Sequence, residues 1–364
     1  MINLFKVVPR RFNVGNAIIQ LATARMLRDA FEEPVNLVPL GAIAADSEAW
    51  LSGLTARSVH EMNLYGHGVI VGGGNLYENG QLDVEVNALE RLAPPLLLWS
   101  LSYGRIYDRR GRLTRRTDSM PDELIAALNR AATASLARDD ATLSHLRSLG
   151  LSAVGLGGCP TLFLDELVPI TAWPSDESSG TLVSIRNPRL MSIPHSRQIQ
   201  IHGDVHRITE ALAEEGLGPV RLLCHDTRDL EFASTFPAVE YLFADDAFSY
   251  LDLLRRAQLV VSFRLHAFVP CLSYATPTVN ISYDERSLSF VHTLGLGDWD
   301  INLITEADLA ATVLDRVRRL PALTELVTDS RPLWDEQRAT MHATLAQFGE
   351  QVRAYAAEPT PAAS

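Results

Sequence analysis

The 364-residue sequence contains a single lysine, Lys6, among its 32 basic residues, so arginine supplies nearly all of its positive charge. Walker A phosphate loops and Schiff-base sites both require a lysine, and Lys6 in MINLFKVV stands in neither context. An anion bound through side-chain charge must therefore be bound mainly by arginine, whose planar fork of donors matches pairs of carboxylate or phosphate oxygens.

Cysteine is also scarce. The three cysteines lie far apart and form no C-x-x-C pair: Cys159, Cys224 and Cys271. This spacing indicates neither a disulfide framework nor a zinc site, and we expect three buried thiols.

Long apolar runs are missing as well. No segment approaches the 18 or more residues that cross a bilayer, and the N-terminus lacks the central apolar segment of a signal peptide, so we expect a cytoplasmic protein. The formal net charge of -12 argues against nucleic acid or anionic lipid as the main partner. It is still compatible with a local basic cleft. The arginine and alanine bias suggests a bacterium of high GC content.

Short apolar segments alternate with helical patterns along the chain, which is typical of parallel α/β architecture. The length exceeds that of one ordinary core and favours two domains. We therefore predict two doubly wound, Rossmann-like domains, residues 1–170 and 181–330, with the polar stretch 165–180 as a linker. A long amphipathic helix is expected over residues 331–356, followed by a disordered tail, 357–364.

The segment QLVVSFRLHAFVP places a guanidinium and an imidazole, Arg264 and His266, between apolar stretches. In parallel α/β sheets ligands bind beyond the carboxyl ends of the strands, and these two residues fall where a strand meets a helix. A plainer interpretation is a capped helix start with a solvated arginine.

Three other segments end strands or begin helices in the same way. They are Arg186 in TLVSIRN, the glycine run Gly72, Gly73 and Gly74 with Asn75 in VIVGGGN, and Asn13, Gly15 and Asn16 in RRFNVGNAII. All four segments can face one cleft between the domains. The glycine run lacks G-x-G-x-x-G spacing, so it is equally consistent with a tight turn that lets a strand and a helix pack closely.

A metal site is not expected. His202 and His206 have helical spacing but lack the glutamate of H-E-x-x-H. Asp139 and Asp140 fit a helix start, Cys159-Pro160 fits a turn, and His225 shows no partner in the sequence, which favours a core or surface role.

Taken in order, the segments resemble the polysaccharide pyruvyl transferase family. The matching pieces are N-x-G-N at Asn13, GGG-N at Gly72, S-x-x-R-D at Ser135, C-P-T at Cys159, S-I-R at Ser184, and the long stretch VVSFRLHAFVPCLSYATPTVNISYDERSLSFVHTLGL. The resemblance spans residues 10 to 300, and the last stretch is its most specific part.

The resemblance implies a two-domain fold like that of GT-B glycosyltransferases. It also implies a metal-independent and cofactor-free reaction in which phosphoenolpyruvate donates a pyruvyl group to two hydroxyls of a sugar as a cyclic ketal. The acceptor would be a sugar, a glycan or a lipid-linked saccharide, the last of these at the cytoplasmic face of the membrane.

Residues are assigned on the same basis. Arg186, Arg264, Arg286 and Tyr283 would bind the donor, and His266 would transfer a proton near neutral pH. The acceptor side or cleft would be formed by Asn13, Gly15, Asn16, Gly72, Gly73, Gly74 and Asn75.

Three features depart from the family pattern. Asn16 stands where some members have an acidic residue, although asparagine also occurs there. Many members have a basic residue close behind the S-Y step, whereas here Asp284 and Glu285 precede Arg286, so the sequence does not fix the position of the positive charge. Pro270 should kink the helix after Arg264. Two alternatives remain: a GT-B glycosyltransferase that uses a nucleotide sugar, although no clear E-x7-E pattern is present, and a non-enzymatic sugar-binding subunit.

Overall fold

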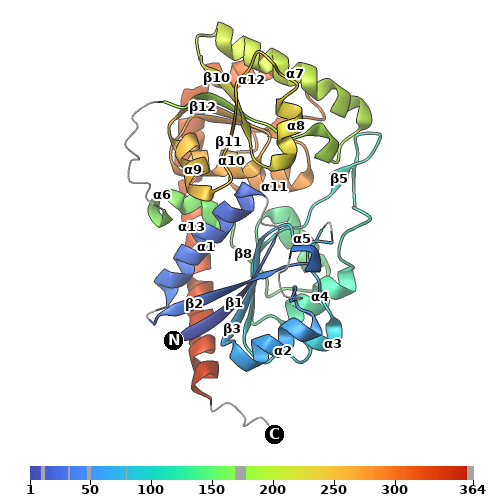
Figure 1. The fold of residues 1–364 in the computed structure, drawn as a ribbon, viewed down its shortest axis with the longest axis vertical. Coiled ribbons are helices and arrows are strands. Elements are labelled where there is room, and N and C mark those ends of the chain that lie inside the picture. Colours follow the sequence, from blue (N-terminus) through green and yellow to red (C-terminus); the bar gives the residue numbers. More distant parts are fainter. Residues whose placement is uncertain (10–12, 32, 47–50, 79, 169–177, 359–364) are drawn as a thin grey trace.

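A computed structural model describes most of the chain, namely residues 1–9, 13–31, 33–46, 51–78, 80–168 and 178–358. Within these ranges the chain forms two parallel sheets of six strands each, one after the other in sequence, with helices packed around both (Figure 1). The predicted α/β class with two Rossmann-like units is confirmed. The proposed linker falls largely on 169–177 and the tail on 359–364, both outside the described residues.

The first sheet has the strand order β2-β1-β3-β4-β7-β8. Its strands are β1 (Ile2–Val8), β2 (Val35–Gly41), β3 (Gly68–Gly74), β4 (Leu96–Leu101), β7 (Ala134–Ala137) and β8 (Gly155–Leu156). Alternation along β1 sends Leu4 and Phe5 into separate hydrophobic clusters on opposite faces of the sheet. Both faces are therefore covered, as parallel sheets require.

The helices of this half differ in length. They are α1 (Val14–Ala30), α2 (Ala56–Tyr65), α3 (Val86–Leu89), α4 (Asp122–Ala131), α5 (Asp140–Ser148) and α6 (Leu164–Leu167). The segment LDVEVNALERLA has helical spacing, which predicts a helix, but only the single turn α3 forms there. Asp139 is the N-cap of α5, as its position predicted, and its side chain accepts a hydrogen bond from the Thr142 amide at 3.0 Å.

The second sheet has the order β11-β10-β9-β12-β13-β14, which is the Rossmann order 3-2-1-4-5-6. Its strands are β9 (Gly180–Ser184), β10 (Val220–Cys224), β11 (Tyr241–Phe243), β12 (Ala257–Ser262), β13 (Thr278–Ser282) and β14 (Ile301–Asn302). The helices are α7 (His195–Glu214), α8 (Leu230–Ala233), α9 (Ala247–Arg255), α10 (Leu265–Ser273), α11 (Glu285–Thr293) and α12 (Leu309–Arg318).

Each sheet has a point at which the strand order reverses, between β1 and β3 in the first and between β9 and β12 in the second. The segments that follow these four strands carry Asn13, Asn75, Arg186 and Arg264. Ligands of open α/β sheets bind at such switch points. The four segments selected from the sequence therefore leave the two sheets at the positions best suited to binding.

The two domains are in direct contact around these loops. Asn13 and Asp226 form an isolated antiparallel bridge, and the Val14 amide donates to the His225 carbonyl at 3.3 Å. On another side, the Ala141 amide at the start of α5 donates to Ser289 Oγ of α11 at 2.9 Å. A hairpin of β5 (Ile106–Tyr107) and β6 (Leu113–Thr114) adds further contacts between the domains.

The long C-terminal helix α13 (Leu320–Ala357) begins at Leu320 and not at residue 331. Pro332 lies inside the helix, and Pro321 occupies the first turn, where proline is well tolerated. The helix runs along both domains (Figure 1). Trp334 Nε1 donates to the Leu294 carbonyl at 2.8 Å in the second domain, whereas Phe348 and Val352 pack against Gly68 in the first. No helix in the described ranges is both long and apolar enough to span a membrane.

Candidate active site

A cavity of about 410 Å³ lies where the loops after the strands of the two domains meet. Both domains contribute to its walls, and the wall includes six arginines: Arg116, Arg138, Arg186, Arg228, Arg264 and Arg286. This concentration of positive charge stands out in a chain with a net charge of -12. The cavity is therefore suited to an anionic ligand.

The structure brings most of the predicted site residues together. Nine of them line the cavity: Asn13, Asn16, Gly74, Asn75, Arg186, Arg264, His266, Tyr283 and Arg286. The other three, Gly15, Gly72 and Gly73, stand behind the cavity wall, where they pack against neighbouring elements.

The glycine run combines both interpretations offered by the sequence. A side-chain carbon at Gly72 would lie 2.3 Å from the Trp99 carbonyl oxygen, and one at Gly73 would lie 2.1 Å from Ile19 of α1. These two glycines permit close packing, which is the plainer interpretation. Gly74 has φ of 107° and leads directly to Asn75 in the cavity wall, so its backbone requires glycine as well.

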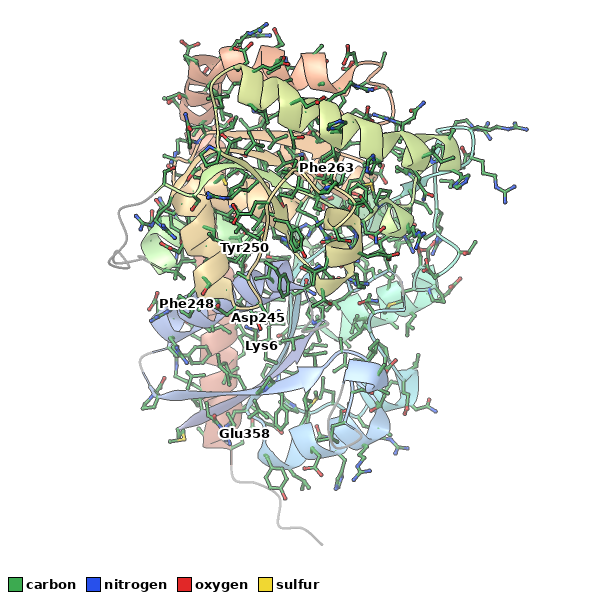
Figure 2. The ribbon with its side chains drawn as sticks, turned by 45° about the horizontal axis from the view of Figure 1, so that its top comes forward. Lys6, Asp245, Phe248, Tyr250, Phe263 and Glu358 are labelled. Carbon is green, nitrogen blue, oxygen red and sulfur yellow. The ribbon has the colours of Figure 1, made fainter. Side chains whose placement is uncertain are left out.

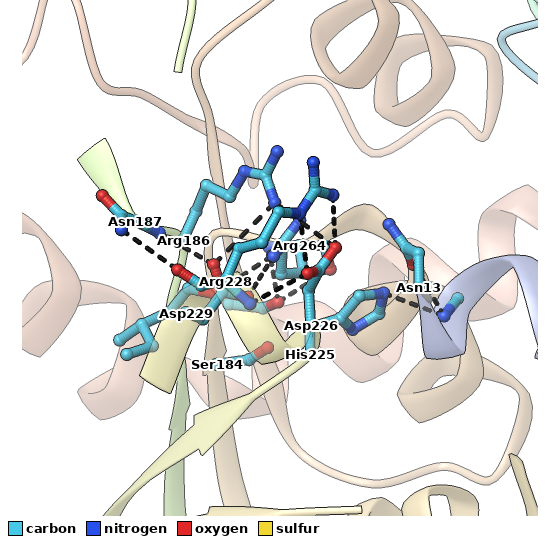
Figure 3. A network of polar contacts seen from close by, with 12 residues as sticks. Asn13, Ser184, Arg186, Asn187, His225, Asp226, Arg228, Asp229 and Arg264 are labelled. Carbon is cyan, nitrogen blue, oxygen red and sulfur yellow. Dashed lines mark hydrogen bonds and ion pairs between the residues drawn. The ribbon is translucent and has the colours of Figure 1, made fainter. Parts of the chain in front are cut away.

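Arg264 is the N-cap residue of α10, and its side chain is fixed by the domain to which it belongs (Figure 3). Its Nε donates to the Ile185 carbonyl at 3.0 Å, and its Nη2 donates to the fully buried carboxylate of Asp229. Asp229 also accepts a hydrogen bond from the Asn187 amide at 2.9 Å. Much of the charge of Arg264 is thus already balanced within the protein.

Arg186 is less well satisfied. Its side chain is 12% exposed and forms only long ion pairs, at 3.8 Å to Asp229 and 3.9 Å to Asp226. Among the residues that the structure describes, its buried Nε and Nη1 atoms have no hydrogen-bond partner. Burial, followed by the nearby charge of Arg264, lowers the pKa of Arg186 to about 10, so the group remains cationic at neutral pH. Such a guanidinium is ready to bind an anion.

Arg138 is a second arginine of this kind. It belongs to the S-x-x-R-D segment but was not among the predicted site residues. It follows β7 in the first domain, is 3% exposed and lines the cavity. Its Nε lies 3.7 Å from Asp139 and has no hydrogen-bond partner in the described part of the chain. The guanidinium carbon lies 5.6 Å from the centre of the Phe290 ring. Its position at a strand end was the signal that could have identified it.

His266 occupies a kink near the start of α10. Its φ and ψ of -87° and 19° are not helical, and Pro270 lies four residues farther on. A proline ring clashes with the carbonyl four residues before it and has no amide to donate to that carbonyl. The predicted kink is therefore present, and it falls at His266. The Nε2 atom lies 3.9 Å from the thiol of Cys159, one of three buried free cysteines.

The pKa of His266 is lowered to about 3, first by burial and then by the positive charges of Arg138, Arg286 and Arg264. The imidazole of the free protein is thus neutral at pH 7 and able to accept a proton. This differs from the expected titration near neutral pH, because the sequence revealed neither the burial of the ring nor the number of arginines around it.

His225 has partners that the sequence did not show. Its Nε2 accepts a hydrogen bond from the Gly15 amide at 3.0 Å, and its Nδ1 lies 2.9 Å from the hydroxyl of Tyr250. Tyr250 lies in the interior of the second domain (Figure 2). Burial and three neighbouring cationic or imidazole groups hold the pKa of His225 well below its usual value. A neutral His225 therefore connects α1 to the second domain.

Arg286 is placed by acidic residues from both domains. Its Nε donates to Asp284 at 3.1 Å, and its Nη1 lies 3.6 Å from the fully buried carboxylate of Glu78. Burial raises the pKa of Glu78 to about 7, against the opposing effect of Arg286. Glu285 turns away and pairs with Arg105 at 2.5 Å. The departure around residues 284–286 thus leaves the basic residue in the cavity.

The described residues contain no group of three or more side chains arranged to hold a metal ion. His202 stacks on Phe236 with ring centres 4.4 Å apart, and His206 pairs with Glu210 at 3.6 Å. Both histidines have ordinary structural contacts.

The fold is similar to that of UDP-GlcNAc 2-epimerases. The Methanocaldococcus jannaschii enzyme in complex with UDP-GlcNAc and UDP is 12% identical, with a TM-score of 0.54, and the match covers 88% of this chain and 92% of that one. S. aureus MnaA bound to UDP is 12% identical, with a TM-score of 0.55 and coverage of 97% and 94%. The Neisseria meningitidis enzyme bound to UDP-GlcNAc is 9% identical, with a TM-score of 0.52 and coverage of 98% of both chains. These likenesses show the GT-B-like fold alone.

The sequence itself matches the model of the family described as polysaccharide pyruvyl transferase over residues 13–285. The matched range begins at the N-cap of α1 and ends at Glu285, the first residue of α11 and the neighbour of Arg286, so it includes almost every segment that lines the cavity. This chain belongs to the polysaccharide pyruvyl transferase family.

Proposed function

We propose that this protein transfers a pyruvyl group from phosphoenolpyruvate to two hydroxyls of a sugar or glycan, forming a cyclic ketal. The observation that carries the proposal is a pair of arginines with unsatisfied buried N–H groups, Arg138 from the first domain and Arg186 from the second, in one cavity with the neutral His266.

Phosphoenolpyruvate carries a carboxylate and a phosphate, and each of these groups binds best to a planar pair of N–H donors. Arg186 and Arg138 have donors to spare, whereas Arg264 is held by Asp229. In this proposal the first two arginines bind the anionic groups directly, and Arg264 adds positive charge from a fixed position. A donor bound in this way bridges the two domains.

The reaction balances without a cofactor. The donor C3 gains a proton and becomes a methyl group, while one sugar hydroxyl oxygen bonds to C2. The second hydroxyl oxygen then bonds to C2 as the bond from C2 to the phosphate oxygen breaks. Of the two hydroxyl protons, one matches the proton gained at C3 and the other leaves with the phosphate.

His266 is the proposed site of proton transfer. As a neutral imidazole it can accept the proton of the attacking hydroxyl. The negative charge of the bound donor opposes that of the surrounding arginines, so donor binding should raise the pKa of His266 and help the ring to carry a proton during the reaction. In the first domain Asn13, Asn16 and Asn75 line the same cavity and offer amide groups that suit sugar hydroxyls.

The first experiment is isothermal titration of the protein with phosphoenolpyruvate, in parallel with UDP- and GDP-sugars. We expect saturable binding of phosphoenolpyruvate, reduced at least tenfold in Arg186→Ala and in Arg138→Ala. Arg189→Ala is the matched control, because Arg189 lies in the same loop as Arg186 but is 79% exposed and pairs only with Glu231 in the structure as described.

Arg264 needs a different design, because its removal would leave the buried Asp229 carboxylate without its main partner. The double variant Arg264→Ala with Asp229→Ala removes both charges and separates loss of binding from loss of folding. Wild-type donor affinity in that variant and in both single arginine variants would contradict the proposed donor site. Binding of a nucleotide sugar in place of phosphoenolpyruvate would support the glycosyltransferase alternative.

A further inference from the structure

A second cavity, of about 360 Å³, lies in the first domain beside the candidate active site. Its walls are mainly apolar and are formed by Leu76, Tyr77, Leu82, Met120, Pro121 and Leu124. None of the six arginines of the first cavity belongs to this wall. Two cavities of opposite character therefore adjoin each other.

The apolar cavity is built from two segments that hold each other in place. The Met120 amide donates to the Tyr77 carbonyl at 2.9 Å, and the Gly80 amide donates to the Asp118 carbonyl at 3.2 Å. Tyr77 is fully buried, and its hydroxyl accepts a hydrogen bond from Asn129 at 3.0 Å. The walls are thus fixed by backbone and side-chain hydrogen bonds, so the cavity is largely preformed.

The two cavities adjoin each other at one shared residue and one ion pair. Gln81 lines both of them. Arg116 of the first cavity pairs with Asp118 of the second, with Nε and Oδ1 separated by 2.7 Å. A molecule that extends past Gln81 would place a polar part among the arginines and asparagines and an apolar part among the leucines.

Phosphoenolpyruvate cannot be that molecule, because all of it except one methylene group is polar or charged. The apolar cavity must then serve the acceptor. The first-domain wall of the active site leads from Asn75 through the segment of Leu76 and Tyr77 into this cavity. A sugar bound against Asn75 would direct one of its substituents there.

We propose that the acceptor is a glycoside with a compact alkyl or aryl group on or next to the sugar that receives the ketal, and that this group occupies the apolar cavity. The inference rests on the proposed function, because it assigns the acceptor of that reaction. The volume limits the group to a compact one, in contrast to a long polyisoprenoid chain.

The test compares methyl, butyl, octyl and dodecyl β-glycosides of glucose, galactose, mannose and N-acetylglucosamine, each below its micelle-forming concentration. Binding is measured by isothermal titration, with phosphoenolpyruvate titrated separately. For at least one sugar we expect the octyl glycoside to bind at least tenfold more tightly than the methyl glycoside. Full burial is worth about fourfold per methylene group. The gain should stop before dodecyl, once the cavity is full.

Two variants locate the effect. Leu124 is half-buried in the first turn of α4, so Leu124→Asn makes the wall polar and Leu124→Trp fills the cavity with little disturbance of the core. Both should reduce the octyl advantage to less than threefold and leave phosphoenolpyruvate affinity unchanged. Leu64→Asn, on the exposed surface of α2, is the matched control and should keep the full advantage.

Each outcome decides a different point. Equal or absent binding of octyl and methyl glycosides, in a protein that binds phosphoenolpyruvate, would overturn the apolar subsite and leave the proposed function intact. An octyl advantage that persists in both Leu124 variants would place the alkyl group elsewhere and also overturn it. A gain that continues through dodecyl would favour a long-chain lipid acceptor over a compact group. Failure to bind phosphoenolpyruvate would count against the function itself, whatever the glycosides do.

Discussion

Gly15 offers a sharp test of the contact between α1 and the second domain. A side-chain carbon at this position would lie 2.4 Å from His225 Nε2 and 2.8 Å from His266 Cβ. Neither atom can move easily, because the His225 ring is also held by Tyr250 and the His266 Cβ belongs to the kinked start of α10. We predict that Gly15→Ala forces α1 away from the second domain.

The expected size of the effect follows from two contributions. Overpacking of a close contact costs about 1–3 kcal/mol, and loss of the buried hydrogen bond from Gly15 to His225 costs about 1 kcal/mol. The entropy of unfolding of a chain of 364 residues is about 0.8 kcal/mol per kelvin. If the closely joined domains unfold as one unit, the melting temperature should fall by about 3–5 °C. Donor affinity should fall as well, because His266 is displaced.

Differential scanning calorimetry measures the first effect and titration with phosphoenolpyruvate the second. Gly203→Ala is the matched control, since Gly203 lies inside α7 and a side-chain carbon there would meet only Arg207, at 3.9 Å. In an open helix interior alanine is favoured over glycine by about 1 kcal/mol, so this variant should melt about 1 °C higher. If Gly15→Ala behaves like Gly203→Ala in both assays, the two domains are not in the contact described.

Three further predictions concern titration and metals. Burial and the nearby arginines lower the pKa of His266 to about 3, and the negative charge of bound phosphoenolpyruvate should raise it again. Donor binding near pH 5 should therefore be accompanied by proton uptake in the wild type but not in His266→Asn. Titration in buffers of different ionisation enthalpy measures this uptake, and equal uptake by the two proteins would contradict the prediction. Burial raises the pKa of Glu78 from 4.5 to about 7, so the folded state should lose up to about 3 kcal/mol as the pH rises through that range. Glu78→Gln should flatten this part of the curve of melting temperature against pH. Some slope should remain, because burial also raises the pKa of Asp300 to about 7. An unchanged curve in Glu78→Gln would refute the pKa assigned to Glu78. The double variant His202→Ala with His206→Ala should keep donor binding and catalytic activity in the presence of EDTA, and a folded but inactive variant would reopen the possibility of a metal site.

Much of the fold could be predicted because parallel strands buried on both faces read as short apolar runs. The segments TLVSIRN, VRLLCHD and QLVVSF each became a strand whose last residues lead into the cavity. The carboxyl ends of parallel strands share one edge, so a sequence rule sufficed to bring Arg186 and Arg264 together.

The pairing of charges could not be predicted in the same way. Asp229 binds Arg264 across 35 positions of sequence, and Glu78 approaches Arg286 from the other domain. These contacts depend on how the domains meet, and they decide which arginines keep N–H groups for a ligand. Arg138 followed the same strand-end rule as Arg186, but its open N–H became evident only with its neighbours in place.

Helix lengths were the least predictable feature. The apolar spacing across LDVEVNALERLA predicts a helix but produced only the single turn α3, while α13 begins at Leu320 and not at the predicted residue 331, with Pro332 in its interior. Proline removes one hydrogen bond from a helix, but the packing of a long helix against two domains can outweigh that loss.

The long helix α13 also sets an order of events on the ribosome. Phe348 and Val352 complete the hydrophobic core around Leu4 and Gly68, yet they are translated after the whole of the second domain. N-terminal domains usually fold as soon as they emerge. Here an apolar surface of the first sheet must wait uncovered, open to chaperones or to premature association, until the residues near 350 leave the exit tunnel. The domain that is synthesised first is therefore completed last.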